Sequence, residues 1–523
     1  MGKEMKKASK AVWYRQEKIK EVIEVLAVLA LGFVLMFGIL IKSGTLKSGY
    51  HFMDDHELIR IEYTLENTEQ SVGSLMHAMI NNDFHWRFRP FYWVERVGCT
   101  AVFGSDLLPW NIYTGIKGVL AFAFLVLAAR KLKFGRVISF LFAAIIMFGP
   151  QFTPWYRSAN QENTGLLLCA LVLWLISMQY HMGKYNGKGW NAAIIISIII
   201  CGLVKESFTL CMPAFAAFKF WLEYTETPGD KLWKCLRRNW VVYASIAVAF
   251  LCNVLWILFR VGVDNVSYAG FQEGTRLSEY FDGIWYSLTV FLKQYAQAGI
   301  ILLVILVVVF CLLDKSKRKK YAGYALIGGY VMGVQLVAHA KSLMWERYLI
   351  PFIIGYAMVF ILLGYKMLEK REFIRTIYVG ILIVLLAVEA PVAYEEAQGY
   401  AYTGQMTDKF LQFVKAYTEE DDVIIGAFVD DELNLATACW LEVNGRTGEF
   451  QYSWTDGSLR DTVQIGAAGN GETQWQLADA ALCYAYQEDQ IKGMMGEIEG
   501  TTLKGHVYGS YCVIFREQNE GTE

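Results

Sequence analysis

Residues 22–41 read VIEVLAVLALGFVLMFGILI and carry a single charged side chain, directly after a basic segment that ends at residue 21. A helix needs roughly 17–25 mainly apolar residues to cross a bilayer. The run is also longer than the roughly 7–15 residues of a signal-peptide core, and no convincing small-residue cleavage site follows it. We therefore expect residues 22–41 to form a retained membrane-spanning helix.

The composition extends this interpretation to the whole chain. Of the 523 residues, 55% are hydrophobic and only 19% are charged, and the mean hydropathy is +0.31, which is unusual for a soluble protein. The net charge is −2 and no basic stripe with interleaved aromatic residues occurs, so we expect no nucleic-acid partner. The ten cysteines form no CxxC or Cys/His zinc spacing, so we predict neither a disulfide framework nor a zinc site.

Similar apolar runs recur along the chain and predict an all-α polytopic membrane protein with about eleven spanning helices. The predicted spans are residues 22–41, 111–129, 136–150, 164–180, 191–205, 207–222, 240–260, 297–313, 321–339, 347–365 and 374–391. Lys and Arg concentrate in alternate loops, near residues 130–136, 184–188, 231–238, 315–320 and 366–375. Because cytoplasmic loops carry an excess of these cations, we expect a plasma-membrane protein with the N-terminus in the cytoplasm and the C-terminal region outside.

This topology divides the chain into three parts. We predict a basic cytoplasmic N-terminus at 1–21, a membrane domain at 22–391 with a large first outer loop at 42–110, and an acidic extracytoplasmic domain at 392–523. The last part has strand-like runs at 423–429, 480–486 and 506–515 and helical patterns at 406–419 and 489–498. These runs predict a small α/β fold.

Under this topology, charged residues from several loops meet on the outer face. They are Asp54 and Asp55 in the first outer loop, HWRFRPFYW at 85–93, WYRSANQEN at 155–163, KES at 205–207 and WERY at 345–348. Ionisable residues at membrane depth are costly and usually line a polar cavity. Each of them is therefore a candidate for a functional site.

The acidic candidates also have structural interpretations. Asp54 and Asp55 fit a helix N-cap and first-turn acid, which would stabilise a helix start. Glu162 fits the same role for a helix that begins near residue 163. A capping role and a catalytic role are compatible for the aspartates.

The basic candidates have structural alternatives as well. Arg87 and Arg89, set among aromatic residues, fit the anchor of an interfacial helix as well as a phosphate site. Lys205 and Glu206 fit an internal ion pair that stabilises a tight turn. Arg347 fits an interface anchor. The sequence leaves these alternatives open.

Together these residues resemble the motifs of the GT-C superfamily of membrane glycosyltransferases, which includes the protein O-mannosyltransferases and the bacterial aminoarabinose transferase for lipid A. The resemblance covers about residues 20–390 by topology. The matching features are the acidic pair Asp54-Asp55 in a long first outer loop, RPFY at 89–92, QEN at 161–163, Lys205-Glu206, and RYLIP at 347–351.

The resemblance implies an inverting glycosyltransferase. Its partners would be the membrane lipid and a polyprenyl-phosphate-linked sugar, which reaches the enzyme from the bilayer and serves as the donor. The acceptor would be an extracytoplasmic glycan, lipid or protein of the cell envelope. By analogy Asp54 is the general base, and Asp55 is either a neighbour that raises its basicity or the base itself.

The resemblance also implies roles for the remaining candidates. Since the leaving group is a phosphate, the site needs cations, and guanidinium groups bind phosphate bidentately. The candidates for the donor phosphate are Arg87, Arg89, Lys205 and Arg347. Glu162, Glu206 and His85 are expected beside the acceptor, the sugar or a metal. Related enzymes with and without a divalent metal exist, so a requirement for Mg or Mn stays open.

Three other functions compete with this hypothesis. A transporter or lipid flippase would place charges near the bilayer midplane and show repeated halves, whereas here the ionisable residues cluster at one edge and no repeat is visible. An outer-face glycan polymerase or ligase would rely on a late outer loop, whereas here the first outer loop is the longest between helices. A structural or sensor protein that displays the region 392–523 is the third alternative.

Overall fold

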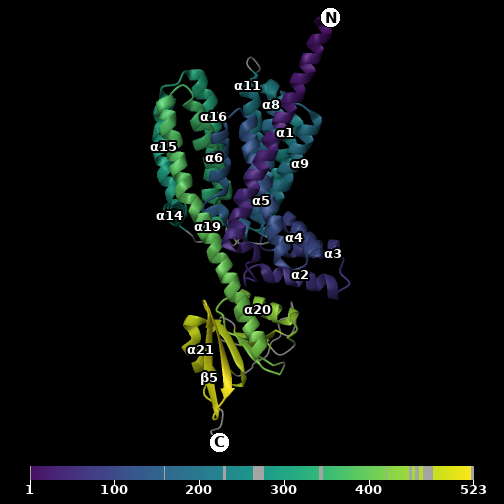
Figure 1. Cartoon of the computed structure of the whole chain (residues 1–523), viewed down its shortest axis with the longest axis vertical. Coiled ribbons are helices and arrows are strands. Elements are labelled where there is room, and N and C mark those ends of the chain that lie inside the picture. Colours follow the sequence, from purple (N-terminus) through teal and green to yellow (C-terminus); the bar gives the residue numbers. More distant parts are fainter. Residues whose placement is uncertain are drawn as a thin grey trace. The chain divides into compact units, whose positions relative to one another are not determined.

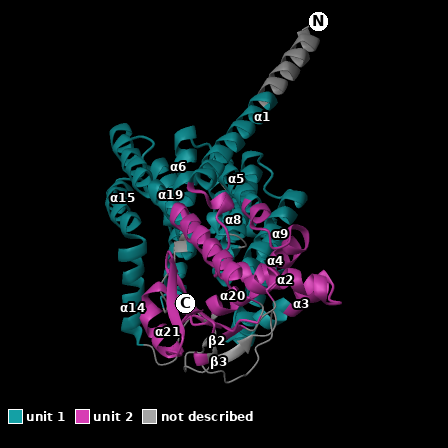
Figure 2. Cartoon of the chain, turned by 60° about the horizontal axis from the view of Figure 1, so that its bottom comes forward, with its two compact units in different colours: residues 1–42, 79–93, 112–396 teal, residues 43–78, 94–111, 397–523 magenta. Residues whose placement is uncertain are grey.

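The computed structural model of the chain divides into two compact units (Figure 2). The first unit comprises residues 1–42, 79–93 and 112–396, and the second comprises residues 43–78, 94–111 and 397–523. The structure describes residues 2–157, 160–227, 231–262, 276–340, 346–419, 421–446, 450–453, 459–462 and 475–519. Ser158, Ala159 and Trp345 of the predicted outer-face segments lie outside the described residues.

The first unit is built from helices (Figure 1). Those that lie wholly or mainly in it are α1 (Gly2–Ser43), α5 (Leu107–Lys131), α6 (Arg136–Met147), η2 (Pro150–Phe152), α7 (Thr153–Tyr156), α8 (Gln161–His181), α9 (Lys188–Val204), α10 (Glu206–Thr209), α11 (Met212–Glu226), α12 (Leu232–Arg238), α13 (Trp240–Trp256), η3 (Ile257–Val261), α14 (Leu277–Tyr286), η4 (Ser287–Phe291), α15 (Lys293–Cys311), α16 (Lys315–Ala338), η5 (Glu346–Leu349), α17 (Ile350–Ala357), η6 (Met358–Leu363), α18 (Gly364–Met367) and α19 (Glu372–Tyr417). Small residues allow two helices to pack closely. At Gly355 of α17, an added Cβ atom would lie only 2.7 Å from the carbonyl oxygen of Gly328 in α16, so glycine is needed there.

Within the described residues, 8 helices are long and apolar enough to cross a membrane, or up to 9 if the bent pair at 136–156 is one span. The helical membrane body is thus confirmed, but the predicted count of about eleven spans is not. Helix α9 is apolar yet falls among the shorter helices of 10–17 residues. The predicted span at 207–222 is divided between the short helix α10 and the 15-residue helix α11.

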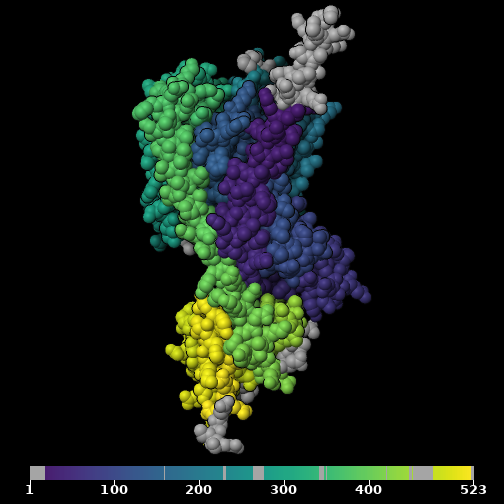
Figure 3. All heavy atoms as spheres, in the orientation of Figure 1, coloured from purple at the N-terminus to yellow at the C-terminus, as the bar shows by residue number. Residues whose placement is uncertain are grey.

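The apolar side chains of α1 explain how this body meets lipid. Val22, Val34 and Ile41 are all more than half exposed, and the purple surface of α1 is uncovered in Figure 3. A long, exposed apolar helix is stable in hydrocarbon because its backbone hydrogen bonds are satisfied within the helix. The run at 22–41 therefore forms the kind of helix that its composition predicts.

The second unit contains the sheet. Its elements are η1 (Thr45–Lys47), α2 (Asp55–Asn67), most of α3 (Val72–Asp83) and α4 (Pro90–Phe103), then β1 (Ile424–Gly426), α20 (Asp431–Val443), β2 (Phe450–Ser453), β3 (Leu459–Thr462), η7 (Trp475–Leu477), β4 (Ala480–Tyr484), η8 (Ala485–Gln487), α21 (Glu488–Met495), β5 (Thr501–Tyr508) and β6 (Tyr511–Gln518). The strand order is β3-β2-β1-β4-β6-β5. Strand β1 is parallel to β2 and β4, and the other pairs are antiparallel.

The predicted α/β fold at the C-terminal end is confirmed, with two local corrections. The run at 506–515 was expected to be one strand but forms parts of β5 and β6, which reverse at Gly509 with a φ of +59°. Glycine reaches that left-handed conformation without strain. In addition, the predicted span at 374–391 and the predicted helix at 406–419 belong to one continuous helix, α19.

The core of the second unit combines the C-terminal fold with the segment just after α1. Strand residues Ile424, Leu482 and Val513 are fully buried in one hydrophobic cluster. Tyr50 and Phe52 belong to the same cluster and are also buried. The segment that carries Asp54 and Asp55 therefore folds as part of the C-terminal α/β core.

Candidate functional site

Lys205 and Glu162 form an ion pair inside the first unit, and their side chains are only 2% and 1% exposed. Glu162 lies in the first turn of α8, where a carboxylate complements the helix dipole. Lys205 is the extended residue that separates α9 from α10. Burying two charges is costly even when they are paired, so an ionisable pair at membrane depth is a candidate for a functional site.

The ring of Tyr348 brings a second cation to this pair. The Nζ atom of Lys205 lies 3.7 Å from the centroid of the ring. The guanidinium carbon of Arg347 lies 5.1 Å from the same centroid, and its NH2 group donates to the Tyr348 hydroxyl at 3.2 Å. On the same ring, His339 stacks with a centroid separation of 5.0 Å. Cation–π contacts of this kind hold cations without neutralising them.

Arg87 supplies a third cation from another part of the chain. Its Nε atom lies 3.7 Å from Oε1 of Glu206, which also accepts the backbone N–H of Phe88 at 2.7 Å. The charges of Arg87 and Arg347 both act on Lys205. Arg87, Lys205 and Arg347 thus form one cluster, although they come from segments far apart in the sequence.

Three buried polar atoms of Glu162 and of residues shortly before it in the chain have no hydrogen-bond partner among the described residues. They are Oε2 of Glu162, Nδ2 of Asn160 and Nε1 of Trp155. A buried polar group without a partner is costly and is usually satisfied by a bound molecule or water. The atoms include an acceptor and two donors, which suits a ligand that carries hydroxyl groups.

Two candidates from the same predicted loop are arranged differently. Arg89 donates from Nε to Oδ2 of Asp83 at 3.0 Å, and its guanidinium lies 4.4 Å from the ring centroid of Tyr92. The side chain of His85 is exposed. The contacts of Arg89 therefore fit an anchor for its own segment, one of the two roles that the sequence left open.

Lys117, a buried lysine of α5, was not among the predicted site residues. Its ammonium group donates to Asn163 and, at 2.9 Å, to Oγ1 of Thr164, both beside Glu162. It also lies 4.4 Å from the ring centroid of Tyr113. A lysine inside the predicted span 111–129 was the available signal, because a cation at membrane depth is a functional candidate by default.

In the second unit, Asp54 has an unusual backbone. Its φ of 71° and ψ of −27° are left-handed, and it stands at the N-cap of α2 without making a side-chain cap hydrogen bond. The buried Arg96 donates from NH2 to the carbonyl oxygen of Asp54, and its Nε lies 3.2 Å from Oε2 of Glu57. A non-glycine residue in this conformation is strained and persists only when its surroundings fix it.

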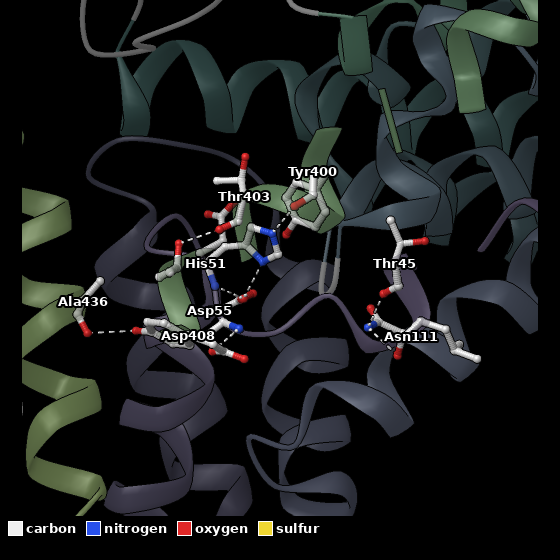
Figure 4. A network of polar contacts seen from close by, with 12 residues as sticks. Thr45, His51, Asp55, Asn111, Tyr400, Thr403, Asp408 and Ala436 are labelled. Carbon is white, nitrogen blue, oxygen red and sulfur yellow. Dashed lines mark hydrogen bonds and ion pairs between the residues drawn. The ribbon is translucent and has the colours of Figure 1, made fainter. Parts of the chain in front are cut away.

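The side chain of Asp55 is buried and engaged (Figure 4). Its Oδ2 accepts the backbone N–H of His51 at 2.9 Å and lies 3.5 Å from Nδ1 of the same histidine. The His51 ring stacks on Tyr400 at a centroid distance of 3.6 Å, and its Nε2 is 2.9 Å from the Tyr400 carbonyl oxygen. Asp55 therefore holds the loop in place.

Two titratable groups near the aspartates have shifted pKa values. Burial raises the pKa of Glu432 to about 7, and the nearby Asp54 carboxylate adds to the shift. Oε1 of Glu432 accepts the backbone N–H of Asp54 at 3.3 Å. Burial also lowers the pKa of His56, and the charge of Arg96 acts in the same direction. A neutral His56 and an easily protonated Glu432 are thus the neighbours of Asp54.

The predicted site residues are divided between the two units. Asp54 and Asp55 belong to the second unit. The others, Arg87, Arg89, Lys205, Arg347, Glu162, Glu206 and His85, belong to the first. Across the described residues, no group of three or more His, Cys, Asp or Glu side chains could hold a metal ion. We derive no step through Mg or Mn.

No family model matches the sequence, and neither does any curated protein. The fold is similar to that of the crystal structure of ArnT from Cupriavidus metallidurans bound to undecaprenyl phosphate. The two chains are 12% identical, the alignment covers 94% of this chain and 97% of that one, and the TM-score is 0.48. At this distance the likeness assigns neither an activity nor any site residue to this chain.

Proposed function

We propose that this chain is an integral-membrane glycosyltransferase of the GT-C type. It would move a sugar from a polyprenyl-phosphate donor to an acceptor on the extracytoplasmic face of the plasma membrane. The observation that carries the proposal is the cluster of Arg87, Lys205 and Arg347 in a helical membrane body, in which the buried Lys205 is paired with Glu162. Cations inside such a body suit an anionic lipid headgroup.

The proposed roles in the first unit follow from charge. Arg87, Lys205 and Arg347 would bind the phosphate of the donor, and their charge would stabilise the phosphate as it leaves. Glu162, whose Oε2 has no partner among the described residues, would accept a hydrogen bond from a sugar hydroxyl. Glu206 would keep Arg87 in place through their contact at 3.7 Å.

The proposed role in the second unit is general-base catalysis. Asp54 would take the proton of the acceptor hydroxyl as its oxygen attacks the anomeric carbon. The bond from that carbon to the phosphate oxygen breaks, and its electron pair leaves with the polyprenyl phosphate. Because the acceptor oxygen attacks from the face opposite the phosphate, the configuration inverts. We favour Asp54 over Asp55 as the base because the Asp55 carboxylate is buried and already bonded to His51.

The test is a release assay on purified protein in lipid vesicles. A panel of polyprenyl-phosphate sugars is supplied with envelope glycans, lipid acceptors and peptides, and free polyprenyl phosphate is measured. The proposal predicts release that depends on the acceptor and product with inverted anomeric configuration. Absence of release across the panel, or product with retained configuration, would contradict it.

A further inference from the structure

The carboxyl ends of parallel strands are where α/β sheets usually bind ligands. In the second unit these ends are marked by Phe428 after β1 and Tyr484 at the end of β4, with ring centroids 5.3 Å apart. The ring of Phe52 lies 5.6 Å from that of Phe428 and 5.0 Å from that of Tyr511. The chain therefore fills this edge of its sheet with its own aromatic residue.

Tyr50 attaches the same segment to two helices of the C-terminal fold. Its hydroxyl donates to the carbonyl oxygen of Ala436 in α20 at 2.9 Å, a contact drawn in Figure 4. Its backbone N–H donates to Oδ1 of Asp408 in α19, also at 2.9 Å. The preceding residue, Gly49, has a φ of +83° and approaches Asp408 so closely that a Cβ atom would meet the carboxyl carbon at 2.7 Å. The path of the segment is thus fixed on both sides of Tyr50.

The backbone N–H and the backbone carbonyl oxygen of Asp54 are each hydrogen-bonded to a charged side chain. Glu432, in the first turn of α20, accepts its N–H at 3.3 Å, while Arg96 of α4 donates to its carbonyl oxygen. Asp430 caps α20 by accepting the N–H of Glu432 at 2.9 Å, which fixes the start of that helix. These contacts account for the persistence of a left-handed backbone at Asp54.

We propose that Glu432 is a positioning residue, through which the C-terminal α/β fold sets the backbone of Asp54 and so aims its carboxylate. The inference rests on the proposed function in one respect, since it takes Asp54 as the base. It assigns to the region 397–523 a role in catalysis that does not require it to touch the donor or the acceptor.

The experiment compares Glu432→Ala, Glu432→Gln and Glu432→Asp with the wild-type chain. Glutamine keeps an acceptor oxygen at the right distance for the Asp54 N–H, alanine removes it, and aspartate retracts it by one methylene. Asp489→Asn is the matched control, because Asp489 is an exposed acid on α21 of the same fold. Each protein is studied as the full chain in lipid.

Two measurements are made on each variant. Hydrogen–deuterium exchange of peptides covering residues 50–56 reports on the loop, and exchange at β4 reports on whether the fold is intact. Turnover is resolved into kcat and the donor KM. In Glu432→Ala we expect faster exchange at 50–56 with β4 still protected, and a kcat lowered roughly 10- to 100-fold at unchanged donor KM, since small displacements of a reacting group have effects of this size.

Glu432→Gln should restore both values to near the wild-type level, and Asp489→Asn should match the wild type. If hydrogen–deuterium exchange at β4 becomes faster in Glu432→Ala, the fold of that variant is not intact, and the comparison uses Glu432→Asp instead. Unchanged exchange at 50–56, or faster exchange with unchanged kcat, would overturn the proposal. A wild-type protein that releases no polyprenyl phosphate would refute the proposed function instead, while the exchange data would still decide whether Glu432 holds Asp54.

Discussion

Lys205, in the extended break between α9 and α10, pairs with Glu162 in the first turn of α8, and both side chains are almost entirely buried. Removing one partner of such a pair leaves the other charge without compensation in a medium of low dielectric constant. The pair therefore has consequences for stability that can be separated from its proposed role in binding.

We expect Lys205→Met to lower the free energy of unfolding by about 3–5 kcal/mol, because Glu162 is left as an isolated buried charge. Thermal unfolding of the protein in detergent measures the effect. The double variant Lys205→Met with Glu162→Gln should recover most of the stability but not donor binding. Lys492→Met breaks a more exposed pair with Glu488 and should have little effect. A Lys205→Met protein as stable as the wild type would contradict the buried pair.

The three-cation cluster predicts that two neighbouring arginines differ in donor binding. Arg87→Met should raise the donor KM roughly 10- to 100-fold, as expected for losing hydrogen bonds between charged groups. Arg89→Met should have a smaller effect on KM, because Arg89 is paired with Asp83 on its own segment. Steady-state kinetics over a range of donor concentrations gives both values. A larger effect of Arg89→Met than of Arg87→Met on the donor KM would show that the donor phosphate does not bind at the cluster.

The shifted pKa of Glu432 makes stability depend on pH. A carboxyl group with a pKa of about 7 when folded and about 4.5 when unfolded binds more protons in the folded state. Its contribution therefore favours the folded state below about pH 4.5 and is lost as the pH rises through 7. The charges of Asp54, Asp430 and Glu57 add to the shift, while the bond from the Asp54 N–H opposes it.

We accordingly expect the unfolding temperature to fall more between pH 5 and pH 8 in the wild type than in Glu432→Gln, which cannot ionise. Asp489→Asn serves as the control for a change of surface charge. Equal falls in the wild type and in Glu432→Gln would show that Glu432 titrates at its ordinary pKa.

The aromatic core of the second unit predicts a contrast between adjacent residues. Phe52 is 3% exposed and Met53 is 49% exposed. Phe52→Ala should cost about 3–5 kcal/mol of stability, as is usual for a buried phenylalanine, whereas Met53→Ala should stay within about 0.5 kcal/mol of the wild type. Unfolding of the full-length variants measures both. Equal stability of the two variants would mean that the segment before α2 is not part of the core.

The features that could be predicted from the sequence are those encoded locally. An apolar run such as 22–41 specifies a spanning helix by its length and composition alone. Lys205 and Glu162 stood out because ionisable residues between apolar runs are unusual. Both positions were predicted as site residues because burying a charge is costly, and not because of any pattern of spacing.

Other features depend on contacts that no local pattern encodes. The stretch around Phe52 reads as a loop, and nothing in it specifies that its ring packs against Phe428 and Tyr511. The strands that receive it begin only at residue 424. The proposed role of Glu432 could not be predicted for the same reason. An acid near a helix start is common, and only the structure shows that Glu432 accepts the N–H of Asp54.

Asp54 is the proposed base of a lipid-linked sugar transferase. The most direct test is the single-turnover rate of Asp54→Asn, a change that preserves the size of the side chain, measured alongside donor binding. We expect a rate lowered roughly 10²- to 10⁴-fold, with donor affinity and unfolding temperature unchanged. A rate equal to that of the wild type would contradict it.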